Sequence, residues 1–123
     1  MNISELDLLK QQCYIDGAWQ DADDGKTIDV GNPSTGEKLG TVPKMGAGET
    51  RRAIAAASAA LPAWSAKTAK ERAAILRRWF DLMMENQEQL AKIMTAEQGK
   101  PFDESMGEIA YGASFIEWFA EEG

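Results

Sequence analysis

Histidine is missing from the 123-residue sequence, and cysteine occurs once, as Cys13. The absence of histidine excludes histidine-based catalytic triads, histidine metal ligands and the usual general base near neutral pH. A single cysteine forms neither an intrachain disulfide nor a thiolate zinc site. Since no histidine can activate its thiol, Cys13 is expected to be a buried structural residue rather than a nucleophile.

Basic residues and long apolar runs are also scarce. The 13 Lys and Arg against 20 Asp and Glu leave a net charge of −7, which argues against a nucleic-acid partner. The longest nearly apolar run, residues 53–64, is about half of the roughly 20 residues that a membrane span needs, and Pro62 interrupts it. The N-terminus has no signal-peptide pattern. We therefore expect a soluble, cytoplasmic protein with no membrane partner.

Residues 1–45 are predicted to form strands and turns. Residues 13–19 alternate around Asp16-Gly17, and residues 27–30 follow a polar turn at residues 23–26. These two segments are expected to pair as an antiparallel hairpin. Residues 38–43 are predicted to form a third strand that ends at Pro43.

Residues 46–123 are predicted to form about four helices. The first begins after Gly46 and ends near Pro62. Its apolar face consists of Ile54, Ala57, Leu61 and Trp64. The second begins at a capping box in which Thr68 and Glu71 satisfy each other's backbone amides. Leu76, Trp79, Phe80 and Met83 supply its apolar face.

A third helix is predicted to follow directly. Asn86 together with Gln89 is expected to cap its start, and Gly99 suits the left-handed residue that ends a helix. Pro101 then stands where a last helix can begin. The predicted fold class of this chain is α+β, with short N-terminal antiparallel strands followed by these helices.

The last predicted helix, residues 102–122, carries two apolar stripes. One consists of Phe102, Met106, Ile109, Ala113 and Ile116, and the other of Tyr111, Phe115, Trp118 and Phe119. Because a surface helix needs only one stripe, this helix is expected to have neighbours on two sides. Gly107 and Gly112, unfavourable inside a helix, suggest close backbone approach. We expect the 123-residue chain to self-associate through this helix.

Three patterns have chemical interpretations that the sequence does not favour. Gly46-Ala47-Gly48-Glu49-Thr50-Arg51 follows a predicted strand and opens a helix, as a dinucleotide-binding loop does. However, Arg51 occupies the third glycine position, so we interpret the segment as a helix start. The acids Glu117, Glu121 and Glu122 are interpreted as a solvated helix face rather than paired catalytic carboxylates. The Trp79-Phe80 and Trp118-Phe119 pairs are interpreted as core or interface packing rather than as a cofactor stack.

Five ordered segments resemble the N-terminal region of the NAD(P)-dependent aldehyde dehydrogenase superfamily. They are Ile15-Asp16-Gly17-Ala18-Trp19, the turn at residues 32–37, the Ala-rich helix that ends in Trp64, the Glu71-Arg72 helix and Glu97-Gln98-Gly99-Lys100-Pro101. The last helix most resembles that of bacterial succinate-semialdehyde dehydrogenases. Together the segments cover nearly the whole chain.

The resemblance implies an α/β parent enzyme in which residues 1–123 are the N-terminal segment of the fold. Residues 46–123 would then pack on the cofactor domain. The parent would be a homo-oligomer that oxidises an aldehyde, succinate semialdehyde in particular, with NADP or NAD. The family is several times longer, and its catalytic cysteine, general-base glutamate and cofactor-phosphate glycines correspond to no position of this chain. The resemblance therefore implies that this segment carries no catalytic or cofactor-binding residues and is inactive alone.

The resemblance also implies a cation site. Some family members bind a cation just before the Asn-Pro turn and just before Gly-Lys-Pro, which here places it at Val30, Gly31 and Glu97. Oxygen ligands suit a hard cation. An alternative of a different class is a stand-alone helical interaction module with no enzymatic ancestry.

Overall fold

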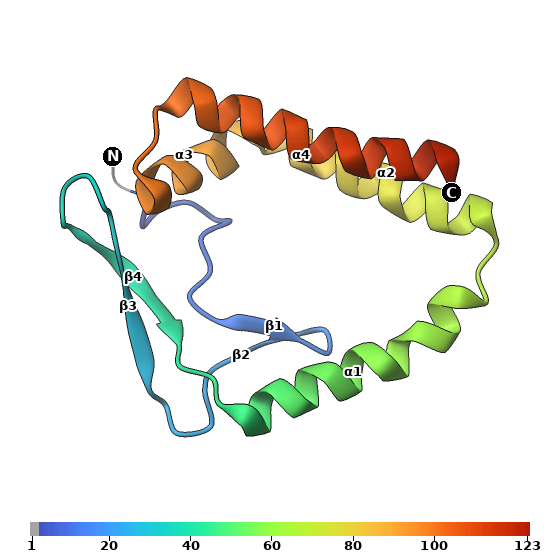
Figure 1. Ribbon diagram of the computed structural model, residues 1–123, viewed down its shortest axis with the longest axis horizontal. Coiled ribbons are helices and arrows are strands. Elements are labelled where there is room, and N and C mark those ends of the chain that lie inside the picture. Colours follow the sequence, from blue (N-terminus) through green and yellow to red (C-terminus); the bar gives the residue numbers. More distant parts are fainter. Residues whose placement is uncertain (1–2) are drawn as a thin grey trace.

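Two β-hairpins form the first part of the chain. The computed structural model describes residues 3–123, shown in Figure 1. Strands β1 (Cys13–Ile15) and β2 (Ala18–Gln20) form one antiparallel pair, and β3 (Thr27–Gly31) and β4 (Lys38–Pro43) form the other. The predicted strands exist, but the predicted pairing of residues 13–19 with residues 27–30 is wrong.

The Asp16-Gly17 turn explains this difference. Both residues have positive φ angles, 51° and 78°, the backbone that a two-residue hairpin turn requires. The chain therefore reverses within residues 13–20, where Tyr14 lies opposite Trp19. Residues 27–31 pair instead with the next strand, so that Asp29 lies opposite Thr41.

Four helices follow, as predicted. They are α1 (Ala47–Ser65), α2 (Ala69–Glu85), α3 (Gln87–Gln98) and α4 (Phe102–Glu122). The capping box of α2 is confirmed, because the Glu71 backbone N–H donates to Thr68 Oγ1 at 3.3 Å while the Thr68 N–H donates to Glu71 Oε2 at 2.7 Å. The fold of this chain is α+β. None of the helices in residues 3–123 is long and apolar enough to cross a membrane.

Asn86 occupies the N-cap position of α3, as predicted, but its side chain does not cap that helix. Instead, Asn86 Nδ2 donates to the Leu82 carbonyl oxygen at 2.8 Å. Asn86 is the only residue between α2 and α3, and its amide is used by the unpaired carbonyls that end α2.

The core lies where α4 packs on α2 and α3. Its buried residues are mostly small, and they comprise Ala91, Ala96, Ser105, Ile109, Ala113 and Ala120. Ser105 and Thr95 join α4 to α3 through a hydroxyl–hydroxyl hydrogen bond of 2.8 Å. The close approach expected at Gly107 and Gly112 is wrong, since a Cβ added at either position would meet no atom within 4 Å.

Helix α1 stands apart from this core. Figure 1 shows α1 along one side of the molecule and α2 with α4 along the other, with the β1–β2 hairpin between them in this view. The predicted apolar face of α1 is open to solvent in the described structure: Ile54 is 62% exposed and Leu61 is 59% exposed.

Candidate functional site

The β3–β4 turn and the end of α3 meet at one junction, which brings together two of the ordered segments described above. Asn32 shapes the turn, because its Oδ1 accepts the Ser34 N–H at 2.9 Å and its carbonyl accepts the Gly36 N–H at 2.8 Å. The turn presents the Ser34 hydroxyl to α3, where Oγ donates to the Gly99 carbonyl oxygen at 3.2 Å. This bond links residues 65 positions apart.

Glycine is required at residue 99 for two separate reasons. Gly99 has a φ of 80°, the left-handed conformation that ends α3 as predicted. A Cβ at this position would also lie 2.7 Å from Ser34 Oγ and 2.9 Å from Pro33 Cγ. The backbone of α3 can therefore touch the turn only where no side chain is present.

A groove of about 400 Å³ opens at this junction. It is lined by Asn32, Ser34, Thr95, Ala96, Gly99, Lys100 and Pro101. Lys100 carries the only charge among them, and its side chain is 14% exposed and paired with Glu108. The Ser34 hydroxyl and the Gly99 carbonyl oxygen join the two segments, whereas Lys100 pairs with Glu108 of α4.

The predicted cation residues lie next to this junction. Val30 and Glu97 line the same cavity of about 20 Å³, which is enough for one water-sized particle. Gly31 is not in that lining but follows Val30 at a β-bulge, and a bulge turns backbone groups out of the strand ladder. The structure therefore brings together two of the three predicted residues and places the third beside them.

Two residues that the sequence did not indicate also line this cavity, Lys10 and Gln11. Gln11 Oε1 accepts the Thr41 N–H of β4 at 2.8 Å, and Lys10 is part of the same lining. Residues 3–123 contain no group of three or more His, Cys, Asp or Glu that could hold a metal ion. No pattern in the sequence marks the N-terminal segment as the part that passes over β4.

Cys13 is half-buried in β1, opposite Gln20, and its thiol is free. The expectation that this residue is buried is therefore wrong. The reason is that the β1–β2 sheet has only two strands, which cannot enclose a side chain by themselves.

The Gly46–Arg51 segment is a helix start, as predicted, and an internal carboxylate occupies it. Glu49 is 8% exposed, and its oxygens accept the Gly46 N–H at 3.0 Å and the Asp23 N–H at 3.1 Å. Hydrogen bonds from its own backbone amide, from Asp23 and from Gly46, together with the Arg52 charge, lower the pKa of Glu49. The amides that would face a phosphate are thus used by the chain itself.

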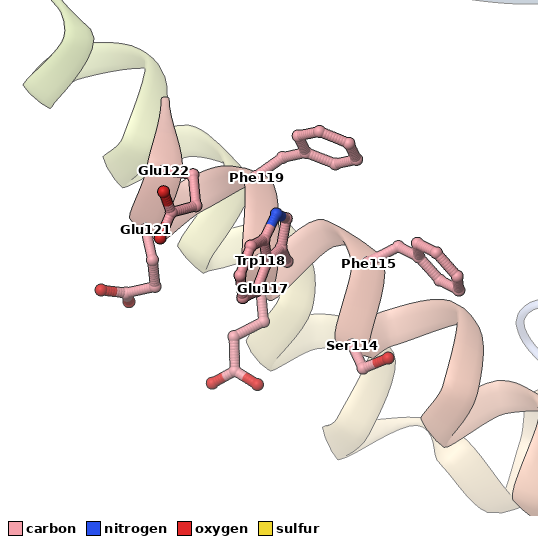
Figure 2. Close-up of a pocket in the computed structure, with 7 residues that line it drawn as sticks. All are labelled: Ser114, Phe115, Glu117, Trp118, Phe119, Glu121 and Glu122. Carbon is pink, nitrogen blue, oxygen red and sulfur yellow. The ribbon is translucent and has the colours of Figure 1, made fainter.

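The acidic end of α4 is tied to α2 rather than simply solvated. Arg77 Nη1 lies 2.9 Å from Glu117 Oε1, and Arg77 Nη2 pairs with Glu121. Hydrogen bonds to these two carboxylates raise the pKa of Arg77. Its guanidinium also lies 5.3 Å from the ring centre of Phe80. The shared arginine therefore joins α2 to α4 through two carboxylates, both of which are labelled in Figure 2.

Comparison with known proteins agrees with this arrangement. The sequence profile of the Aldehyde dehydrogenase family matches residues 19–123. The chain is 67% identical over 122 residues to a glutarate-semialdehyde dehydrogenase of Pseudomonas aeruginosa, covering 99% of this chain and 25% of that protein. It is 64% identical to a succinate-semialdehyde dehydrogenase [NADP(+)] of Escherichia coli, covering 100% of this chain and 26% of that protein.

A solved structure shares both the fold and the sequence. The succinate-semialdehyde dehydrogenase of Burkholderia pseudomallei superposes with a TM-score of 0.93 at 65% identity, covering 97% of this chain and 25% of that one. The chain belongs to the aldehyde dehydrogenase family. It spans about a quarter of the length of the curated relatives it matches. Family membership is at odds with a helical module that has no enzymatic ancestry.

Proposed function

We propose that this chain is the N-terminal part of an NAD(P)-dependent semialdehyde dehydrogenase. The observation that carries the proposal is the 64–67% identity, over essentially the whole chain, to enzymes named for succinate and glutarate semialdehyde. The reaction converts an aldehyde, water and the oxidised cofactor into an acid, the reduced cofactor and a proton. NADP or NAD is the proposed cofactor of the longer enzyme.

Within that enzyme, residues 1–123 act as scaffold. The catalytic cysteine that would form a thiohemiacetal and then a thioester, with its oxyanion site and carboxylate base, belongs to other parts of the family's sequence. The helices of residues 46–123 would pack on the cofactor domain through the apolar faces of α1 and α4. We propose an oligomeric cytoplasmic enzyme, without nucleic-acid or membrane partners, to which this segment contributes no catalytic and no cofactor-binding residue.

The cation site at Val30, Gly31 and Glu97 is part of the same proposal. It is supported by the shared cavity of Val30 and Glu97 and by the adjacent bulge. A cation bound there would hold the β3–β4 hairpin against the end of α3, so its role would be structural.

Succinate semialdehyde is the proposed substrate, and glutarate semialdehyde is its nearest competitor. The two aldehydes differ by one methylene, which an enzyme distinguishes by about 1–3 kcal/mol, or roughly 10–200-fold in kcat/KM. The decisive measurement is therefore the ratio of kcat/KM for both aldehydes, with each cofactor, on the protein encoded by the full reading frame.

Parallel assays on the purified 123-residue chain test the scaffold role. We expect no NAD(P)H production from the chain alone and clear production from the longer protein. NAD(P)H formed by the chain, free of host enzymes, would refute the scaffold role. A longer protein that oxidises neither semialdehyde would refute the proposed substrate class.

A further inference from the structure

The chain contains two Asp-Gly sequences, and each lies at a turn. Asp16-Gly17 closes the β1–β2 hairpin, and Asp24-Gly25 lies in the loop between β2 and β3. All four residues are exposed. Both glycines have positive φ angles, 78° and 68°, and both have open space where a Cβ would stand. Because the two sites match in backbone and in access, the groups around each aspartate decide how differently they react.

An Asp-Gly sequence can react within itself to form a ring. The glycine nitrogen attacks the side-chain carboxyl carbon of the aspartate, so that a C–N bond forms and a C–O bond breaks. The amide proton and the carboxyl hydroxyl leave together as water, and a succinimide remains. Hydrolysis returns one water at either carbonyl of the ring. Opening at the α-carbonyl leaves isoaspartate, in which the main chain runs through the former side chain.

Asp24 is held back from this reaction by its neighbours. Its Oδ1 accepts the Lys26 N–H at 2.9 Å, and its Oδ2 lies 2.9 Å from the Lys26 ammonium. The attacking nitrogen is also engaged, because the Gly25 N–H donates to the Ala22 carbonyl oxygen at 2.9 Å. Hydrogen bonds from the Lys26 backbone and side chain lower the pKa of Asp24, so less of its carboxyl is in the protonated form that releases water.

Asp16 lacks these restraints. Within residues 3–123, neither its carboxylate nor the Gly17 N–H makes a hydrogen bond or an ion pair. Asp16 is also the only non-glycine residue of that range with a positive φ, at 51°, a backbone conformation that is unfavourable for an L-residue. Both the electrophile and the nucleophile of ring closure are therefore free at this site.

The β1–β2 turn can also open with little loss of contact. It joins two strands of three residues each in a two-stranded sheet, and a hairpin of that size is marginally stable by itself. The turn lines a groove of about 340 Å³ beside α1, so space is available for it to move. Local opening of this kind lets the Asp16 backbone rotate out of the turn and into the geometry of ring closure.

We propose that Asp16 is a site of spontaneous isomerisation to isoaspartate, and that the fold protects Asp24 from the same reaction. Asp16 converts through a succinimide formed with Gly17, and solvent water is the only co-reactant. Isoaspartate makes the main chain of the turn one carbon longer. The turn then loses the two-residue geometry that places Tyr14 opposite Trp19, and the β1–β2 hairpin should loosen.

Incubation of the chain at neutral pH in water labelled with heavy oxygen tests the proposal. A sample unfolded in guanidinium chloride gives the reference rate of each site, and circular dichroism verifies the fold of the other sample. Chymotrypsin, used in ordinary water, cleaves after Trp19 and so places Asp16 and Asp24 in different peptides. Mass spectrometry then measures isoaspartate and labelled oxygen in each. Relative to its unfolded rate, Asp16 should convert several times faster than Asp24 in the folded chain.

Two variants separate the causes. Asp16→Glu should remain unconverted, because glutamate would have to close a larger ring, which forms far more slowly. Lys26→Ala removes the ammonium from Asp24 and should speed conversion there while leaving Asp16 unchanged.

Four results would overturn the proposal. The folded chain could slow both aspartates equally, or it could protect Asp16 more than Asp24. Isoaspartate at residue 16 without labelled oxygen would exclude the succinimide route. An unchanged Asp24 rate in Lys26→Ala would show that Lys26 does not protect that site through its charge.

Discussion

At the scale of single residues, Gly99 shows that a sequence pattern predicts a local backbone conformation but not the distant contacts of the same residue. A glycine between the end of a helical pattern and a proline predicts a left-handed cap, and the φ of 80° agrees. The contact with Ser34 and Pro33 was not predictable, because it joins segments 65 positions apart. Likewise, the resemblance indicated Val30 and Glu97 as residues of the cation site. Lys10 and Gln11 line the same cavity because the folded N-terminal segment passes beside it, which no sequence pattern predicted.

Gly99→Ala should destabilise the chain more than Gly25→Ala. Both glycines have positive φ, 80° and 68°, so each substitution incurs the backbone cost of about 1–3 kcal/mol. Only at Gly99 does the added Cβ also collide with the turn, since nothing lies within 4 Å of the Gly25 position. Urea denaturation of the two variants, under identical conditions, measures the difference. Equal losses would show that the turn moves aside freely.

Glu97 carries the charge of the proposed cation site, and its removal should abolish stabilisation by a specific cation. We expect the Tm of the chain to rise when choline chloride is replaced by a potassium, sodium or magnesium salt at equal ionic strength, because a bound ligand stabilises the folded state. The rise should disappear in Glu97→Gln. It should persist in Glu37→Gln, an exposed acid near the β3–β4 turn. Equal Tm values in all salts would argue against the site.

At the scale of elements, the sequence predicted where helices begin and end but did not predict which strands pair. The capping box, the glycine cap and the proline before α4 each act within a few residues, and they placed three helix boundaries correctly. The predicted strand pairing is wrong because two turns, Asp16-Gly17 and residues 23–26, could each close a hairpin. The positive φ angles of Asp16 and Gly17 close it within residues 13–20. Asn86 lies at the predicted cap position, but it is both the C-cap of α2 and the N-cap of α3, and its side-chain amide donates to the Leu82 carbonyl oxygen of α2.

The Glu49 carboxylate joins the start of α1 to the loop between β2 and β3, because it accepts the N–H groups of Gly46 and Asp23. This pair of hydrogen bonds, the Glu49 clamp, should make the stability of the fold depend on pH. The carboxylate has a pKa below the ordinary 4.5. A lowered folded-state pKa contributes stability that is present above the unfolded pKa and is lost as pH falls through the folded one. We therefore expect stability to fall progressively below about pH 4.5, and Glu49→Gln to flatten that dependence. Urea denaturation at several pH values measures it.

Glu49→Gln should also be less stable at neutral pH. The two backbone donors use different oxygens of Glu49, and glutamine has only one acceptor, so an N–H is left facing an amide group. Glu37→Gln serves again as the control, at an exposed position. A Glu49→Gln variant with unchanged stability at neutral pH and the same loss of stability below about pH 4.5 would mean that the clamp does not hold α1.

At the scale of the whole molecule, the packing is uneven. Helix α4 packs on both α2 and α3, whereas α1 makes no comparable contact with another helix in residues 3–123. A groove of about 340 Å³ separates its alanine face from the β1–β2 turn. The unit formed by α2, α3 and α4 therefore holds most of the buried apolar surface. Helix α1 depends on the Glu49 hydrogen bonds, on the ion pair of Arg52 with Asp23 and on its own backbone hydrogen bonds.

Hydrogen exchange should resolve this difference. Local opening requires less free energy where few apolar contacts are lost, so the amides of α1 should exchange faster than those of α2 and α4, although α1 is 19 residues long. Mass spectrometry of peptides from each helix gives the comparison, with Ala-rich α1 peptides corrected for their intrinsic exchange rates. Equal protection of α1 and α4 would show that α1 is held by contacts as extensive as those of the α2–α4 pair, and the description of α1 as a helix apart from the core would be wrong.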